Sequence, residues 1–288
     1  MTAPILFSDS DESLFHLGST AHLMNSISSR LTDQLRLVSP SGRRRPVPPA
    51  LVLVAHGSRD PRALTTVRTL MDRIRELRPA LSVQLGHIEL NEPLLPDTLA
   101  ALGDTPAVLV PLLLGHGHHV KRDIPAMAAA GARVRVAAPL GPHPLLTETL
   151  YARLVEAGWP PAMDPAGRRC SAVVLAAAGS RDPDSAADTG HTARLLSDRL
   201  GVPVLPAYAS AATPTIPTAL RTLTAGGRHR IAIASCFTAP GRFVTQCARQ
   251  APWIVSAPLG SHPAMARLIL HRYDQTLTTP THPQLTPA

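Results

Sequence analysis

The sequence contains an internal repeat of about 120 residues, and this repeat constrains the fold more than any other feature. The segment LVLVAHGSRDP at residues 51–61 returns as AVVLAAAGSRDP at residues 172–183. Three more motif pairs follow in the same order, at offsets between 119 and 124 residues. They are ELNEPLLPDTL and SAATPTIPTAL (89–99 and 210–220), GHGHHV and APGRFV (115–120 and 239–244), and PLGPHP and PLGSHP (139–144 and 258–263). Four ordered pairs predict two similar domains in tandem.

Each repeat alternates short apolar runs with longer mixed segments, which predicts alternating strands and helices. In the first repeat we predict strands at 50–55, 82–90, 107–114 and 134–139, and helices at 62–78, 93–102, 120–130 and 144–157. Hydrophobic residues make up 44% of the chain but aromatic residues only 3%, so Ala, Val and Leu must build the core. Near-continuous aliphatic strands indicate a parallel sheet with helices on both faces. We therefore expect two duplicated α/β domains, each with a four-stranded parallel sheet that binds ligands at the carboxyl ends of its strands.

Shifts in composition predict five segments along the chain. Residues 1–48, rich in Ser, Thr and Arg, and residues 275–288, rich in Thr and Pro, predict disordered tails. Between them we predict a first domain at 49–157, a Pro- and Gly-containing linker at 158–169 and a second domain at 170–274. The net charge is +8, and the first tail holds five arginines against four acidic residues, so the rest of the chain carries +7. A basic protein of this kind suggests an anionic partner.

The cysteine content and hydropathy predict a soluble cytoplasmic protein with no membrane partner. Cys170, Cys236 and Cys247 form no CxxC pair, which is typical of a reduced protein. No apolar run approaches the ~18–20 residues of a membrane span. The N-terminus also lacks the pattern of a secretory signal.

Polar side chains follow the predicted strands of the first repeat. His56 comes directly after the first strand, Glu89 lies near the end of the second, and His119 follows the third. The carboxyl ends of parallel strands meet at one edge of a sheet, so these side chains should share that edge. Two imidazoles and a carboxylate can bind a divalent transition metal, and a neutral imidazole can accept a proton near neutral pH.

The second repeat serves as an internal control for this hypothesis. At the positions that match His56, Glu89 and His119 it carries residues without these groups, namely Ala178, Ser210 and Phe243. The glycine, proline and apolar framework of the motifs persists in both repeats. We therefore predict one functional site in the first repeat, and a structural or substrate-holding role for the second.

Structural interpretations of the same residues remain open. His56 could cap the strand-to-helix turn, and Glu89 could be a solvated loop charge with Glu92 in its place. His87 lies two residues before Glu89, on the same strand face, and is a reserve candidate.

The other histidines receive lesser roles. His116 and His118 are expected at the surface, or as transient metal contacts. His143 and His262 occur in both copies of PLGxHP and are expected to begin helices.

The motifs resemble those of a known family. AHGSRDP, a downstream Glu and the string PLLLGHGHHVKRDIP at residues 111–125 resemble the ATP-independent class II tetrapyrrole chelatases, specifically the sirohydrochlorin cobalto- and ferrochelatases. The resemblance covers residues 50 to about 274 as two chelatase-like, flavodoxin-like halves. It implies that His56 and His119 bind the metal and take up pyrrole protons, assisted by Glu89. Short family members assemble two identical halves from two chains, whereas this long form carries a second half without the ligands and no Cys-rich iron–sulfur tail.

The resemblance implies a metal chelatase, a lyase of siroheme or cobalamin biosynthesis. It would insert Fe²⁺, ahead of Co²⁺, into sirohydrochlorin bound between the halves, with the metal as substrate and no organic cofactor. Arginine forks match carboxylate geometry, so polar and basic residues beside the repeated motifs are candidates to hold the carboxylates of the macrocycle. These candidates are Ser58, Arg59, Lys121, Arg122, Arg181 and Arg242.

Alternative functions also remain. A different tetrapyrrole chelatase, using nickel or another macrocycle, and a non-catalytic metal or tetrapyrrole carrier both fit the same residues. Nucleic-acid binding is a weaker third hypothesis, because the chain shows no aromatic platform or basic helix, and we expect no nucleic-acid partner. The built-in duplication removes the need for a second chain, so we expect a monomer.

Overall fold

The computed structural model describes residues 47–129, 131 and 133–279. The predicted tail at 1–48 therefore lies almost wholly outside the described residues, as does most of the tail predicted at 275–288. From Pro48 onward the described residues belong to one compact unit. No helix in these ranges is both long enough and apolar enough to cross a membrane.

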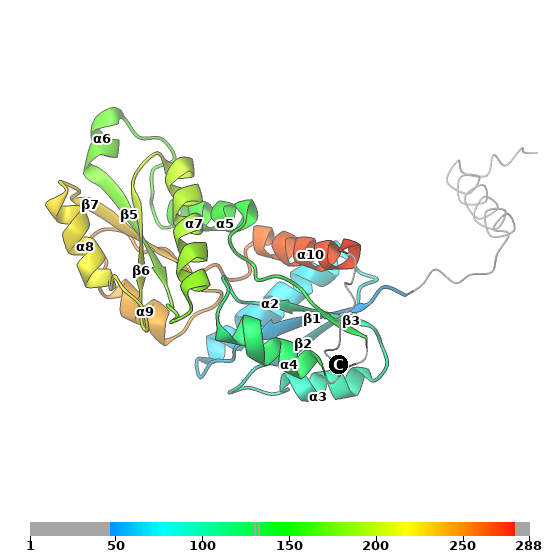
Figure 1. Cartoon of the computed structure of the whole chain (residues 1–288). Helices are drawn as coiled ribbons and strands as arrows, with labels where there is room; N and C mark the ends of the chain where they lie inside the picture. The colour runs from blue at the N-terminus through cyan, green and yellow to red at the C-terminus, as the bar shows by residue number, and fades with distance from the viewer. Residues whose placement is uncertain (1–46, 130, 132, 280–288) are drawn as a thin grey trace, which may run out of the picture. The chain divides into compact units, whose positions relative to one another are not determined.

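The first repeat folds into a parallel sheet of four strands in the order β2-β1-β3-β4. Its strands are β1 (Ala50–Ala55), β2 (Val83–His87), β3 (Ala107–Pro111) and β4 (Val134–Val136). Figure 1 labels the first three of these strands, β1, β2 and β3. Every residue of β1 and β3 is buried, as expected for central strands covered on both faces. The strand pairs are all parallel, so the ends of β1, β2 and β3 lie at one edge of the sheet.

The second repeat folds into a parallel sheet in the order β6-β5-β7. Its strands are β5 (Ser171–Ala177), β6 (Val204–Tyr208) and β7 (Arg230–Ser235). The predicted α/β class and duplication are confirmed, but this sheet has three described strands where the repeat predicted four. The segment matching β4 makes a single bridge, Ile233 to Val255, and does not continue as a ladder.

Helices cover both sheets. They are α2 (Pro61–Leu77), α3 (Leu95–Leu102), the π-helical turn η1 (His119–Asp123), α4 (Ile124–Ala128), α5 (Pro144–Glu156), α6 (Pro165–Cys170), α7 (Pro183–Leu200), α8 (Ile216–Ala225), α9 (Arg242–Ala248) and α10 (Pro263–Thr278). Five of them (α2, α5, α6, α7 and α10) begin at a residue whose side chain caps the first turn. The two HGSRDP-like motifs explain two of these starts. Asp60 and Asp182 cap α2 and α7, and a proline with a preset φ follows each.

The last helix of each repeat packs on the other repeat. Helix α5 follows β4 but contacts α7 and β7, whereas α10 contacts α2 and β3 (Figure 1). The buried Tyr273 of α10 donates a hydrogen bond to the carbonyl oxygen of Pro49 at 2.6 Å, next to the start of β1. Buried side chains of both sheets, including Leu53 and Leu175, belong to one hydrophobic cluster. The two repeats therefore share a core.

Several predicted boundaries shift in the structure. The first strand lies where predicted, but β2 and β3 end three residues earlier than predicted, at His87 and Pro111. The helix predicted at 120–130 is divided into η1 and α4, and Ala130 lies outside the described residues. Helix α10 continues to Thr278, beyond the domain end predicted at 274, and α6 occupies part of the predicted linker.

Candidate functional site

The turn after β1 places His56 at the carboxyl edge of the first sheet. Gly57 follows with φ +104°, in the left-handed region that only glycine adopts without strain. The amide of Ser58 donates to Asn91 Oδ1 at 2.6 Å, and the Ser58 hydroxyl accepts from the amide of Asp60 at 3.1 Å. Asp60 then caps α2, so His56 is not the cap that one interpretation of the sequence proposed.

The loop after β2 brings Glu89 to His56. The amide of Glu89 donates to the carbonyl oxygen of His56 at 3.1 Å, and Glu89 Oε1 lies 3.6 Å from His56 Nδ1. In the second repeat the amide of Ser210 makes the same bond to Ala178 at 3.0 Å. Glu89 and Ser210 therefore occupy equivalent positions in the two repeats, as do His56 and Ala178, in agreement with the sequence motifs.

The loop after β3 brings His119 against His56. The two imidazole rings meet edge to face, with their centroids 4.8 Å apart. His119 Nδ1 donates to Asp123 Oδ2 at 2.6 Å across one turn of η1, which leaves Nε2 of His119 as the atom with a free lone pair. Sequence reasoning missed Asp123. An acidic residue four positions after a histidine on a predicted helix was the signal that could have found it.

The structure thus joins all three predicted residues in one cluster. Among the described residues, however, no three His, Cys, Asp or Glu side chains are arranged closely enough to hold a metal ion as they stand. The part of the predicted set that could accept a cation is the pair of imidazoles of His56 and His119. Glu89 lies next to His56 and contacts its Nδ1 side. His56 and Glu89 are about half exposed, so a ligand can reach them.

The remaining histidines of the loop have other partners. His118 lies 3.4 Å from Asp123 through Nε2 and is exposed, whereas His116 contacts Asp188 of α7. His87 is buried and its Nδ1 lies 3.1 Å from the carbonyl oxygen of Pro93, outside the cluster. The carboxylate of Glu92 accepts from the amide of Leu94 at the start of α3, which is a local structural role.

The prediction for the PLGxHP histidines is confirmed. His143 and His262 each accept, through Nδ1, the amide of the second residue of the following helix, at 3.1 and 3.2 Å. Burial, together with Arg272 and His271, lowers the pKa of His143 to about 4, so it stays neutral and able to accept. Burial also lowers the pKa of His262.

The cysteines lie outside the candidate site. Cys236 and Cys247 are buried, and burial raises the pKa of their thiols to about 12 and about 11. Both therefore remain protonated at neutral pH and are poor metal ligands.

The basic candidates divide into two groups. Lys121 forms ion pairs with Asp182 at 2.8 Å and Asp184 at 2.7 Å. The others are exposed and form no ion pair with a described residue; they are Arg59, Arg122, Arg181 and Arg242.

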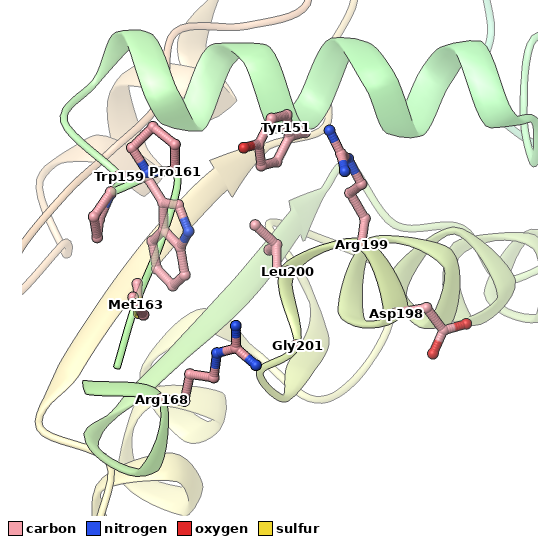
Figure 2. Close-up of a pocket in the computed structure, with 10 residues that line it drawn as sticks. Tyr151, Trp159, Pro161, Met163, Arg168, Asp198, Arg199, Leu200 and Gly201 are labelled. Atoms are coloured by element: carbon pink, nitrogen blue, oxygen red, sulfur yellow. The ribbon is translucent and has the colours of Figure 1, made fainter. Parts of the chain in front are cut away.

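A pocket of about 200 Å³ shares no residue with this cluster (Figure 2). Tyr151, Trp159, Arg168 and Arg199 contribute to its walls. The Arg199 guanidinium stacks over the Tyr151 ring at 4.3 Å. None of the predicted site residues lines this pocket, so it does not change the assignment of the candidate site.

Comparison with known proteins follows the same division into repeats. The CbiX family model matches residues 50–157 and, a second time, residues 172–276, which together exceed half of the chain. The chain belongs to the CbiX family. The two matches to CbiX also show that both repeats derive from the same type of domain.

Curated relatives match from about a quarter to about four fifths of this CbiX protein. A sirohydrochlorin cobaltochelatase of Methanopyrus kandleri is 31% identical over 137 residues, which are 38% of this chain and 96% of that protein. A sirohydrochlorin ferrochelatase of Bacillus subtilis is 24% identical over 245 residues, 79% of this chain and 91% of that protein. With a cobaltochelatase of Methanococcus aeolicus the identity is 42% over 79 residues, and the chain spans only about half of that relative's length (55%).

Solved structures show the same fold. SirB from Bacillus subtilis with Fe³⁺ superimposes with a TM-score of 0.62 at 23% identity, covering 80% of this chain and 95% of SirB. A CbiX described as the terminal enzyme for biosynthesis of siroheme in denitrifying bacteria gives a TM-score of 0.61 at 22% identity, covering 80% of this chain and all of that one. This CbiX chain therefore has the two-repeat chelatase fold.

Proposed function

We propose that this CbiX protein is a sirohydrochlorin chelatase that inserts Fe²⁺ or Co²⁺ into the macrocycle at a single site in its first repeat. One observation carries the proposal. The imidazole ring centroids of His56 and His119 lie 4.8 Å apart at the edge where the strands of the first sheet end. The second repeat has Ala178 and Phe243 at the matching positions. Curated relatives named as sirohydrochlorin cobaltochelatases and a ferrochelatase support it.

The geometry suits the chemistry of metal insertion. The divalent ion enters the macrocycle as two pyrrole N–H protons leave, so the reaction needs groups that hold the ion and groups that accept protons. Neutral imidazoles can do both near neutral pH. In the proposed mechanism His119 Nε2, oriented by Asp123, and the imidazole of His56 hold the incoming ion in place of part of its water shell. As the ion passes to the pyrrole nitrogens, the freed imidazoles accept the two protons.

Glu89 supports His56 in this mechanism. Its carboxylate lies 3.6 Å from His56 Nδ1 and stabilises the imidazolium that forms when His56 takes up a proton. The same carboxylate can join the imidazoles as a third ligand when the ion arrives.

Exposed arginines supply the contacts for the macrocycle. Sirohydrochlorin carries several carboxylates, and guanidinium groups bind carboxylates through two parallel hydrogen bonds. We assign this role to Arg59, Arg122, Arg181 and Arg242, which have no acidic partner among the described residues. Lys121 is already paired with Asp182 and Asp184 and has a structural role instead. The Ser58 hydroxyl accepts from the amide of Asp60, but it is half-buried and its O–H can still donate to the substrate.

An anaerobic turnover assay tests the proposal. Purified protein is mixed with excess sirohydrochlorin and with Fe²⁺, Co²⁺ or Ni²⁺ at matched free concentrations, and the absorption spectrum of the macrocycle is followed. The proposal predicts many turnovers per chain with Fe²⁺ or Co²⁺, and loss of turnover in His119→Ala with an unchanged thermal midpoint. His229→Ala, an exposed histidine of the second repeat, is the matched control and should leave the rate unchanged.

Three outcomes would overturn the proposal. Binding of one macrocycle per chain without turnover would instead make the protein a carrier. Faster insertion of nickel, or turnover only with another macrocycle, would make it a different chelatase.

A further inference from the structure

The histidine-rich loop of the first repeat is held by an acidic residue of the second repeat. The amide of His116 donates to Asp188 Oδ2 at 2.7 Å, and Nδ1 of His116 lies 2.7 Å from the same oxygen. Asp188 lies on α7, and its side chain is only 16% exposed. One carboxylate oxygen therefore accepts from both the backbone and the side chain of the residue three positions before His119.

The loop backbone also packs against this residue. A Cβ at Gly115 would lie 3.1 Å from Asp188 Oδ2 and 3.2 Å from Asp188 Cβ, closer than ordinary van der Waals contact. Glycine at this position lets the loop approach Asp188 closely enough for the His116 bonds to form.

A second contact holds the loop on the other side of His119. Lys121 Nζ lies 2.8 Å from Asp182 and 2.7 Å from Asp184, at the start of α7. These bonds to Lys121 hold the pKa of Asp182 below its usual range, so the pair stays ionised at neutral pH. His119 is thus flanked by two residues, three positions before and two after it, that are anchored to one helix of the second repeat.

The contacts of His116 and Lys121 with the second repeat have no counterpart in the opposite sense, from the matching loop of the second repeat to helix α2 of the first. Each loop faces the motif of the other repeat, since a Cβ at Gly117 would lie 3.6 Å from Ser180 Oγ and one at Gly241 would lie 3.8 Å from Ser58 Oγ. The mirror contact would need partners at the positions matching His116, Asp188 and Lys121. These positions hold Pro240, Thr66 and Thr245.

None of these mirror residues can form the contact. Pro240 has no N–H to donate, and the hydroxyl of Thr66 is bonded within its own helix to the carbonyl oxygen of Arg62 at 2.8 Å. Thr245 has no ammonium group. The anchors are therefore present only for the loop that carries the histidines.

We propose that Asp188 is a positioning residue for the site in the first repeat: it holds the His116 end of the loop so that His119 stays opposite His56. This inference rests on the function proposed above. It gives the second repeat, which lacks the histidines, a defined part in the reaction. Lys121, through Asp182 and Asp184, holds the other end of the same loop.

Two readouts on the full chain test this role. The first is the dissociation constant of Co²⁺ alone, measured by calorimetric titration, and the second is kcat/KM for sirohydrochlorin. In Asp188→Ala we expect kcat/KM to fall and the Co²⁺ dissociation constant to rise, each by about tenfold, as is usual when a residue that orients a ligand is lost. Asp188→Asn keeps an acceptor for the His116 amide and should recover part of both losses. Asp198→Ala removes an exposed carboxylate from the same helix and should change neither.

The outcomes separate this inference from the proposed function. If the wild type turns over sirohydrochlorin and Asp188→Ala matches it in both readouts, the positioning role is wrong and the chelatase stands. If Asp188→Ala weakens Co²⁺ binding but the wild type does not turn over the macrocycle, the positioning role stands and the chelatase is wrong. Equal losses in Asp188→Ala and Asp198→Ala, or a wild type that neither binds Co²⁺ nor turns over, would overturn the positioning role. A fallen thermal midpoint in Asp188→Ala with no recovery in Asp188→Asn would also count against it, because it would indicate general destabilisation.

Discussion

Replacing Gly57 with alanine should damage both the fold and the site. The residue has φ +104°, and an added Cβ would lie 1.9 Å from the carbonyl oxygen of Glu89 and 3.2 Å from Leu90 Cβ. The left-handed backbone costs about 1–3 kcal/mol for a residue with a side chain. The overlap with the Glu89 backbone costs about 1–3 kcal/mol more, as overpacking usually does. Gly57→Ala should therefore lower the free energy of unfolding by about 2–6 kcal/mol.

The repeat provides a matched control for this variant. Gly179 has φ +90°, and its added Cβ would lie 1.9 Å from the carbonyl oxygen of Ser210. Gly179→Ala should therefore destabilise the protein by a similar amount. Only Gly57→Ala displaces Glu89 relative to His56, and a misplacement of about 1 Å can lower a rate about 100-fold.

Urea unfolding followed by circular dichroism measures the stability of both variants, and turnover of sirohydrochlorin per folded chain measures the site. The expected result is comparable destabilisation with a loss of rate confined to Gly57→Ala. Unchanged stability in Gly57→Ala would refute the steric reasoning. Equal losses of rate in both variants would refute the assignment of the site to the first repeat.

Three further substitutions test the roles of Asp123, Tyr273 and His143. Asp123→Asn should lower kcat/KM about 10- to 100-fold, because His119 loses the carboxylate that orients it. Tyr273→Phe should lower the free energy of unfolding by about 1–3 kcal/mol, because the carbonyl oxygen of Pro49 loses its donor. Burial lowers the pKa of His143 from 6.5 to about 4, so the unfolded chain binds more protons between these values, and stability should fall as the pH drops through that window. His143→Asn keeps a capping acceptor and should flatten this part of the pH profile.

Each of these expectations has a contrary result. Wild-type kcat/KM in Asp123→Asn would show that the carboxylate does not orient the imidazole. An unchanged urea midpoint in Tyr273→Phe would show that the bond from α10 does not hold the start of the first strand. A pH profile of stability that is identical in wild type and His143→Asn would show that this histidine does not titrate as its burial implies.

The repeat made much of the fold predictable from sequence. Alternating aliphatic runs predicted both parallel sheets, and β1 lies at the predicted residues because an all-apolar run bounded by Pro49 and His56 has clear ends. The end of β2 was predicted too late. The chain leaves the strand after His87 for a loop in which Leu90 has φ +69°, and the apolar residues of that loop do not reveal this backbone conformation.

The long-range contacts could not be predicted. The packing of α5 and α10 on the opposite repeat depends on surfaces that are distant in sequence. The apolar stripe of a helix shows which face is buried but not which element covers it. The sequence also did not indicate that the second sheet would have no strand equivalent to β4 among its described residues. The matching segment keeps its apolar character but forms only one bridge to β7, from Ile233 to Val255.

For the candidate site, the sequence predicted the clustered residues but not the long-range contact that holds their loop. The contrast between the repeats identified His56, Glu89 and His119, and the structure places them together. The bond from His116 to Asp188 joins residues 72 positions apart and has no local signature.

The most direct test of the central claim is the turnover of sirohydrochlorin by the double variant His56→Ala/His119→Ala. The rate per folded chain is compared with that of the wild type and of Phe243→Ala, which changes the matching position of the second repeat. We expect the double variant to fall to the uncatalysed rate with both Fe²⁺ and Co²⁺, and Phe243→Ala to stay near the wild-type rate. A double variant that still turns over near the wild-type rate would contradict the claim that one site in the first repeat carries the reaction.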